Sequence, residues 1–280
     1  MAESSGERLR VWTLADVVCT IKYPLWTAWR FLVDFPRAVR NTIVVLDLFR
    51  RTAYIGYRVL RVLDRNGGRW SARTRGRYVW RVARRFWATW VLRRAGIDLA
   101  VVGTDRVDWA KPHIVVSNHQ STLDIFPLIA AIPFGRYVVK KEVLAFPYVG
   151  AACRRGAQVI VDRGNHEQAM RAIREGMREW PDCNLVFFAE GTRSRDGALG
   201  TFKKGAFAIA KETGLPVVPV AITGTWDALP KGSLLRLKRK SSIQIEFGRA
   251  IAAEGGVLEL TDRTRGLIAG MIEGRHLHTG

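Results

Sequence analysis

Short apolar runs alternate with segments of helical periodicity from residue 96 onward. Residues 96–103 alternate between apolar and polar positions as in a strand, and 113–117 and 184–188 are short apolar runs typical of buried strands. Residues 166–180 and 204–213 have the apolar spacing of helices. Strands that alternate with helices usually form one sheet covered on both faces. We therefore predict an α/β domain at 96–280, with a mixed sheet flanked by helices.

Residues 1–95 have a different pattern, which predicts an amphipathic helical region. Residues 9–33 and 43–63 are apolar but interrupted by charged side chains, so neither reaches the roughly eighteen uninterrupted apolar residues of a membrane-spanning helix. We expect each to form an amphipathic helix. The Asn-Gly-Gly-Arg sequence at 66–69 predicts a break before a third helix at 77–94.

The third helix separates an aromatic stripe from an arginine stripe on a helical wheel. This pattern is typical of a helix that lies in a membrane surface, but it also fits a helix packed on the α/β domain with its arginines in solvent. The apolar stripe consists of Val79, Val82, Ala83, Phe86, Trp87 and Trp90, and the basic stripe of Arg77, Arg81, Arg84 and Arg85.

Charge and tryptophan content favour the membrane interpretation of this region. The 280 residues have a net charge of +20, with 20 Lys and Arg against 6 Asp and Glu in residues 1–95 and 25 against 19 in the rest. Seven of the ten tryptophans also lie in residues 1–95. Because arginine and tryptophan are favoured at lipid headgroups, we predict that 1–95 is a membrane-associating region that binds an anionic membrane surface.

The amino terminus and the cysteines bear on the cellular compartment. The first seven residues lack the basic and apolar regions of a cleaved signal peptide. The three cysteines form no CxxC pair, which predicts neither a disulfide framework nor a metal site. We expect a peripheral or monotopic protein at the cytoplasmic face of the cell membrane.

A histidine and an aspartate with a His-x4-Asp spacing supply the candidate chemistry. His119 follows the apolar run 113–117, and Asp124 lies where a helix is expected to begin. In such a strand-to-helix turn the carboxylate can hold one ring nitrogen, which leaves the other free to act as a general base. Ser121 and Asp124 also fit a helix-capping box, which needs no histidine.

Three further segments decide between these interpretations. From about Gly96 to about Ile251, over half of the chain, the sequence resembles the glycerolipid acyltransferases, and most nearly the 1-acylglycerol-3-phosphate acyltransferases, which make phosphatidic acid. The family usually has proline where this chain has Ala189, a position that shapes the loop and not the chemistry. The matching blocks are Asn-His-Gln-Ser-Thr-Leu-Asp at 118–124, Lys-Lys-Glu-Val-Leu at 140–144 with 146–150 and 159–163, Phe-Ala-Glu-Gly-Thr-Arg-Ser at 188–194 with 202–206, and Val-Val-Pro-Val-Ala-Ile at 217–222.

The resemblance implies a reaction and a set of residues for it. His119, oriented by Asp124, takes the proton from the acceptor hydroxyl as that oxygen attacks an acyl thioester, either acyl-CoA or an acyl carrier protein derivative. No bound cofactor, metal or acyl-enzyme is required, and Ser121 fits a cap better than a nucleophile. The implied substrate-binding residues, which hold the phosphate of a lysophospholipid acceptor, are Lys141, Glu190, Gly191, Thr192 and Arg193.

Several alternatives remain open at this point. Glu190 and Arg193 also fit an ordinary ion pair in a surface turn. Lys140 and Lys141 lie on opposite faces of a strand, so only one of them is expected to reach the phosphate, and we favour Lys141. The alternative acceptor is another lysolipid or glycerol 3-phosphate. A nucleic-acid binder or a non-catalytic membrane scaffold explains the charge but not the four blocks, so no nucleic acid is expected as a partner.

Overall fold

The computed structural model describes residues 14–66, 68–146, 148–156, 158–162, 164–232 and 236–274, and only the backbone for residues 14–35 and 37. A seven-stranded sheet forms its centre, in the order β1-β7-β6-β2-β5-β3-β4. The β6–β7 pair is antiparallel and the others are parallel, so the predicted mixed sheet is confirmed. The strands are β1 Ile97–Val102, β2 Ile114–Ser117, β3 Gly135–Lys140, β4 Val159–Val161, β5 Asn184–Phe188, β6 Val217–Thr223 and β7 Ser241–Phe247.

The strand directions bring distant segments to one edge of the sheet. Because β7 is antiparallel to β6 and parallel to β1, the strands β1 and β7 begin at the edge where β2, β5 and β6 end. We call this edge the carboxyl edge. The segments just before β1 and β7 therefore lie at the carboxyl edge, together with the loop after β2.

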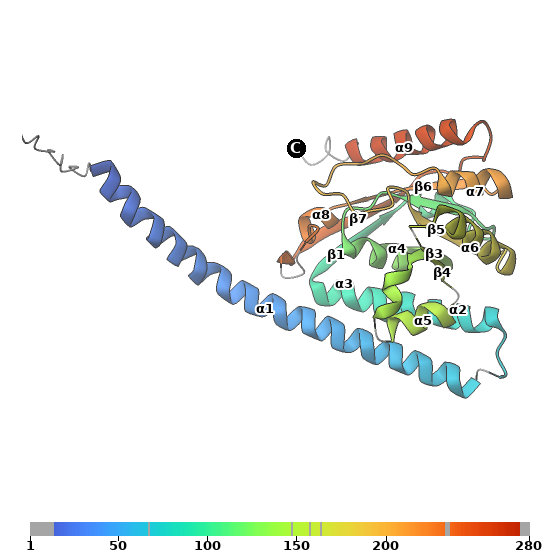
Figure 1. The fold of residues 1–280 in the computed structure, drawn as a ribbon, viewed down its shortest axis with the longest axis horizontal. Coiled ribbons are helices and arrows are strands. Elements are labelled where there is room, and N and C mark those ends of the chain that lie inside the picture. The colour runs from blue at the N-terminus through green and yellow to red at the C-terminus, as the bar shows by residue number, and fades with distance from the viewer. Residues whose placement is uncertain are drawn as a thin grey trace, which may run out of the picture.

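Helices cover both faces of the sheet, as Figure 1 shows. One face carries the helices from the amino-terminal part of the chain together with those after β2 and β3, and the other carries α6, α7 and α9. The first group comprises α1 Leu14–Asn66, α2 Ala72–Val82, the π-helical turn η1 Ala83–Ala88, α3 Thr89–Ala95, α4 Ile125–Ala131 and α5 Val149–Arg155, and the second comprises α6 His166–Glu179, α7 Gly205–Thr213 and α9 Val257–Glu273. Shorter turns are η2 Thr104–Arg106, η3 Thr122–Asp124, η4 Lys141–Ala145 and α8 Thr225–Ala228.

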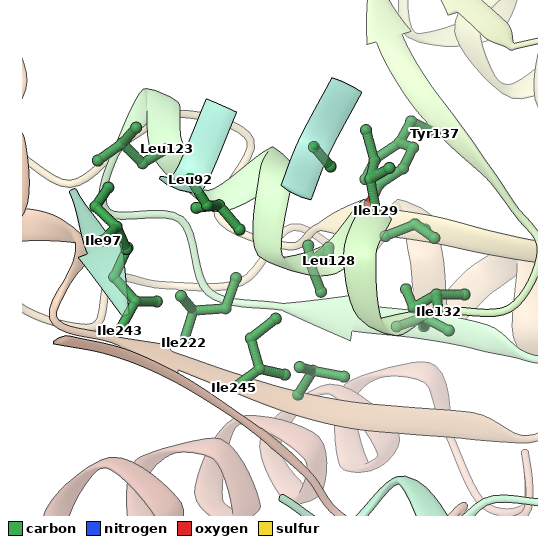
Figure 2. Packing of buried hydrophobic residues seen from close by; sticks show 14 of the residues in the cluster. Leu92, Ile97, Leu123, Leu128, Ile129, Ile132, Tyr137, Ile222, Ile243 and Ile245 are labelled. Atoms are coloured by element: carbon green, nitrogen blue, oxygen red, sulfur yellow. The ribbon is translucent and has the colours of Figure 1, made fainter. Parts of the chain in front are cut away.

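Strand alternation divides the apolar side chains between two cores. In β2, Ile114 and Val116 point toward α6, α7 and α9, while Val115 points toward α4, and all three are fully buried. Figure 2 shows the second of these cores, with side chains of α4 above side chains of β6 and β7. This packing fixes the β2–α4 connection, in which His119 and Asp124 lie.

Residues 14–66 form one continuous helix, α1, where the sequence predicts two. The carboxyl-terminal part of α1 packs against the domain through buried Val44, Val59 and Leu63, while its amino end extends beyond the domain (Figure 1). The break expected at 66–69 is confirmed, because α1 ends at Asn66. No helix in the described part of the chain has the length and apolar character needed to cross a bilayer.

The helix expected at 77–94 is present, and its predicted apolar stripe faces the domain only in part: Ala83 and Trp87 pack, partly buried, against the core. Trp80, Ala88 and Leu92 are buried against the α/β domain, whereas Phe86 of the predicted stripe is 58% exposed. From residue 83 onward, the π-helical turn η1 shifts the register of the side chains relative to a regular helical wheel. Two arginines of the basic stripe also bind protein: Arg77 pairs with Asp182 at 3.0 Å and Arg84 donates to the Ala130 carbonyl at 3.1 Å. The packed alternative therefore describes this helix, and the boundary at residue 95 stays a prediction.

Candidate active site

Asn118 carries the β2–β6 pairing one residue past the end of β2. Its side-chain Nδ2 donates to the Ile222 carbonyl, and its Oδ1 accepts from the Ile222 amide, each at 2.8 Å. The side chain of Asn118 thus pairs with the backbone of β6 as a neighbouring strand would, and Asn118 is 1% exposed. These two hydrogen bonds fix the point at which the chain leaves the sheet, one residue before His119.

His119 and Asp124 are in direct contact, as the sequence predicts. Nδ1 of His119 lies 2.7 Å from Oδ2 of Asp124, and the same oxygen accepts from the amides of Gln120 at 2.7 Å and Ser121 at 2.8 Å. The capping box is therefore also present. The two interpretations are compatible, because one buried carboxylate oxygen caps the turn and orients the imidazole.

The imidazole is held on its face as well as at Nδ1. The ring of His119 stacks on Phe188 at the end of β5, with centroids 3.9 Å apart and planes inclined by 15°. The His119 side chain remains 16% exposed, whereas Asp124 is fully buried. Because Nδ1 is engaged by Asp124, Nε2 is the ring nitrogen left to exchange a proton with a substrate.

Glu190 supports the backbone around this histidine and does not pair with Arg193. Its Oε1 accepts from the His119 amide at 2.9 Å and its Oε2 from the Gly200 amide at 3.3 Å. Burial raises the pKa of Glu190, and the two amide bonds and His119 act in the opposite direction. The alternative of a surface ion pair is therefore wrong for this segment, since Arg193 Nη1 instead donates to the hydroxyl of Thr122 at 2.6 Å.

A pocket of about 460 Å³, lined mostly by polar residues, is formed by the loop after β5 at the carboxyl edge. Arg193 and Lys231 both line it, and Lys231 Nζ donates to the Arg193 carbonyl at 3.1 Å. Gly191, between the lining residues Glu190 and Thr192, adopts a φ of 70°, a left-handed conformation that favours glycine. The lining residues are Glu190, Thr192, Arg193, Ser194, Arg195, Asp196, Ala198, Leu199, Gly200 and Lys231.

Comparison with known proteins identifies this arrangement. Residues 98–223 match the acyltransferase family model. The chain contains an acyltransferase-family domain. It is 32% identical over 187 residues to a putative 1-acyl-sn-glycerol-3-phosphate acyltransferase of Caenorhabditis elegans (64% of this chain and 64% of the other), and 38% identical over 141 residues to a 1-acyl-sn-glycerol-3-phosphate acyltransferase of Limnanthes douglasii (49% and 50%).

A solved structure extends the similarity beyond the acyltransferase family model. The 1-acyl-sn-glycerophosphate acyltransferase PlsC of Thermotoga maritima superposes with a TM-score of 0.73 at 27% identity, covering 87% of this chain and 98% of that one. The alignments with the curated relatives are partial, and this chain spans 35% to 64% of the length of those it matches. The similarity to PlsC includes the arrangement of sheet and helices described above.

Lys141 of the acyltransferase domain lies outside the pocket. Its Nζ forms a 2.5 Å ion pair with Asp162, whose hydrogen bond raises the pKa of Lys141. Among the described residues that line the pocket, the lysine is Lys231. The sequence analysis missed Lys231 because no motif surrounds it; the signal available was a lone basic residue a few positions after the apolar strand 217–222.

Ala189 makes a contact that the family's usual proline cannot make. Its amide donates to the Ser117 carbonyl at 3.0 Å, and its carbonyl accepts from the Lys203 amide at 2.7 Å. Proline has no amide hydrogen, so the first of these bonds is specific to this variant of the block. The bond extends the β5–β2 pairing to the start of the loop that carries Arg193.

Proposed function

We propose that the protein transfers a fatty acyl group from acyl-CoA or an acyl carrier protein thioester to the free hydroxyl of 1-acylglycerol 3-phosphate, giving phosphatidic acid. One observation carries this proposal: His119, which pairs with Asp124, is hydrogen-bonded through its backbone to two residues that line the same pocket as Arg193 and Lys231. These are Glu190, at 2.9 Å, and Ser194, at 2.8 Å. A base for a hydroxyl and cationic groups for a phosphate are the two elements that this acceptor requires. The names of the similar proteins support the same acceptor.

In the proposed mechanism, Nε2 of His119 takes the proton from the acceptor hydroxyl as that oxygen attacks the thioester carbonyl. The tetrahedral intermediate then collapses, the carbon–sulfur bond breaks, and the imidazolium returns the proton to the leaving thiolate. Asp124 keeps the imidazole in the required tautomer and stabilises its protonated form. General-base assistance of this kind contributes about 10² to 10⁴ in rate.

Direct transfer without an acyl-enzyme is favoured by the position of Ser121. Its hydroxyl donates to the Leu229 carbonyl at 2.6 Å and accepts from the Leu123 amide at 3.1 Å. The side chain is fully buried and serves the turn. Ser121 is therefore a cap in this proposal, and both substrates bind before the chemistry.

Arg193 and Lys231 are the proposed ligands of the acceptor phosphate, together with the backbone and hydroxyl of Thr192. Glu190 and Gly191 shape the loop that presents them. Lys141 can join them only if its ion pair with Asp162 opens. Another lysolipid or glycerol 3-phosphate as acceptor is the alternative, since each has a hydroxyl near a phosphate.

We further propose that α1 holds the enzyme on an anionic membrane surface at the cytoplasmic face. Large apolar side chains remain exposed along the described part of α1, interspersed with arginines. An exposed apolar face with basic flanks is typical of a helix in the headgroup region. The exposed residues are Val39, Ile43, Leu46, Phe49, Tyr54 and Tyr57.

The test of the catalytic proposal uses the detergent-solubilised full chain with an acyl thioester and a panel of acceptors. His119→Ala should lower kcat for 1-acylglycerol 3-phosphate by about 10² to 10⁴ while the protein remains folded. Lys111→Ala, an exposed residue away from the site, is the matched control and should retain the wild-type rate. Retained turnover in His119→Ala contradicts the assignment of the base, and a higher kcat/KM for another acceptor reassigns the substrate.

A further inference from the structure

A second pocket, of about 500 Å³, lies where α1 meets the acyltransferase domain. Three arginines from separate segments line it: Arg40 from α1, Arg94 from the end of α3, and Arg239 from the segment before β7. The remaining lining is apolar and comes from α1, namely Pro36, Val39, Ile43 and Val44. The pocket therefore combines a cationic side with an apolar side.

The positive charge of this pocket is incompletely neutralised by the protein. Arg94 Nε pairs with Asp47 at 2.8 Å, but Asp47 also contacts Arg50 at 3.1 Å and Arg51 at 3.8 Å. Within the part of the chain that the structure describes, neither Arg40 nor Arg239 forms an ion pair. Guanidinium groups gathered in this way repel one another, and an anion with several oxygens relieves the repulsion through charge-assisted hydrogen bonds.

The position of the pocket in the fold relates it to the active site. The Lys240 amide donates to the Gly96 carbonyl at 2.7 Å, which holds Arg239 beside the start of β1. The start of β1 lies at the carboxyl edge, where the loop carrying His119 also lies. A second contact, from Asn41 Nδ2 to the Leu237 carbonyl at 2.9 Å, fastens α1 to the same segment.

We propose that this pocket binds the phosphate of an anionic phospholipid of the bilayer, at a site separate from the acceptor pocket. Arg40 and Arg239 contact the phosphate oxygens, and the apolar side chains of α1 accompany the start of an acyl chain. A lipid is favoured over a free anion because apolar residues form most of the lining. A lipid bound here turns the carboxyl edge, and with it the catalytic loop, toward the membrane. This inference rests on the proposed membrane association.

The first experiment measures binding of the full chain to vesicles of phosphatidylcholine with and without phosphatidylglycerol. The double variant Arg40→Ala/Arg239→Ala is compared with Arg58→Ala/Arg61→Ala, which removes the same charge from exposed positions of α1 outside the pocket. Each arginine near an anionic surface adds general attraction, so the control should bind phosphatidylglycerol vesicles up to about 30-fold more weakly than wild type. The pocket variant also loses charge-assisted hydrogen bonds to the phosphate, so it should bind at least about tenfold more weakly than the control. Equal losses in both variants overturn the inference and leave only general electrostatic attraction.

The second experiment distinguishes a result that contradicts the proposed lipid pocket from one that contradicts the proposed membrane association. Dihexanoyl-phosphatidylglycerol, used as a monomer, should bind wild type and the Arg58→Ala/Arg61→Ala control, but bind the pocket variant at least tenfold more weakly. Binding of this probe without vesicle binding supports the pocket and contradicts the membrane proposal. Vesicle binding with equal probe affinity in all three proteins contradicts only the pocket.

Two further measurements address the other sources of a phosphate. Inorganic phosphate at the probe's concentration should not displace the probe, and displacement by it overturns the assignment to a lipid. The pocket variant should keep the wild-type KM for acyl-CoA in detergent. A rise in that KM by about tenfold assigns the pocket to the thioester donor and overturns the proposal.

Discussion

The side-chain amide of Asn118 forms two 2.8 Å hydrogen bonds with Ile222, one to its amide and one to its carbonyl. Through them, the residue next to the proposed base is tied to the neighbouring parallel strand β6. Replacing Asn118 by alanine leaves both groups of Ile222 buried and unpaired, which costs about 1–3 kcal/mol for each group. We expect Asn118→Ala to lower the free energy of unfolding in a denaturant titration and to lower kcat.

Asn184→Ala is the matched control for this prediction. Asn184 is also buried and pairs with backbone groups, accepting from the His113 amide at 3.1 Å and donating to the Phe134 carbonyl at 2.8 Å, but it lies at the start of β5, away from the site. Its replacement should lower stability similarly while the folded fraction keeps its kcat. If both variants lose the same activity per folded molecule, Asn118 has no specific role in positioning His119.

Variants of Asp124 and Ser121 distinguish the proposed catalytic role of this turn from its role in capping the helix. Asp124→Asn keeps the size of the side chain but removes the charge that stabilises the imidazolium, so kcat should fall by about 10² to 10⁴. Ser121→Ala removes the cap and the bond to Leu229 and should cost about 1 kcal/mol of stability, with turnover retained. Steady-state kinetics of the two variants measures the difference, and loss of all activity in Ser121→Ala would restore Ser121 as a candidate nucleophile.

The raised pKa of Glu190 leads us to expect that the free energy of unfolding depends on pH in the acidic range. Burial raises its pKa in the folded state, so the folded protein binds this proton more tightly than the unfolded chain does. As pH rises from the usual glutamate value to the raised value, the unfolded state ionises first, and the contribution of Glu190 to stability falls. Glu190→Gln cannot ionise, so its free energy of unfolding should decline less than that of wild type over the same acidic interval. Denaturant titrations at several pH values test this, and parallel curves for the two proteins contradict it.

Arg193 and Lys231 should share the binding of the acceptor phosphate. A hydrogen bond to a charged group contributes about 1.5–3 kcal/mol, so Arg193→Ala and Lys231→Ala should each raise the acceptor's KM by about 10- to 100-fold, with a smaller change in the KM of the thioester. Lys141→Ala removes the same charge as Lys231→Ala but from the ion pair with Asp162, and it should leave the acceptor's KM near wild type. The reverse result for the two lysines would place Lys141 in the acceptor site.

The sequence by itself determined the features that depend on neighbours along the chain. The strand at 97–102 follows from an alternating pattern, and those at 114–117 and 184–188 follow from short apolar runs. The contact between His119 and Asp124 follows from a spacing of five positions across one tight turn. The capping box forms alongside that contact for a local reason as well, because the Gln120 and Ser121 amides that donate to Asp124 lie within the same turn. Local geometry of this kind is constrained by a few backbone angles, so spacing is enough to predict it.

Only the tertiary structure decided which distant residues meet. Lys231 reaches the proposed acceptor pocket, and Lys141 does not, because of how the segments after β6 and β3 are placed by packing against the rest of the fold. The direction of β1 and β7 brings Arg94 and Arg239 to the edge of the sheet that carries His119, and no periodicity in the sequence encodes a strand's direction. The π-helical turn likewise redirects the side chains of 83–95 by one added residue in a hydrogen-bonded ring, a change that a regular helical wheel cannot represent.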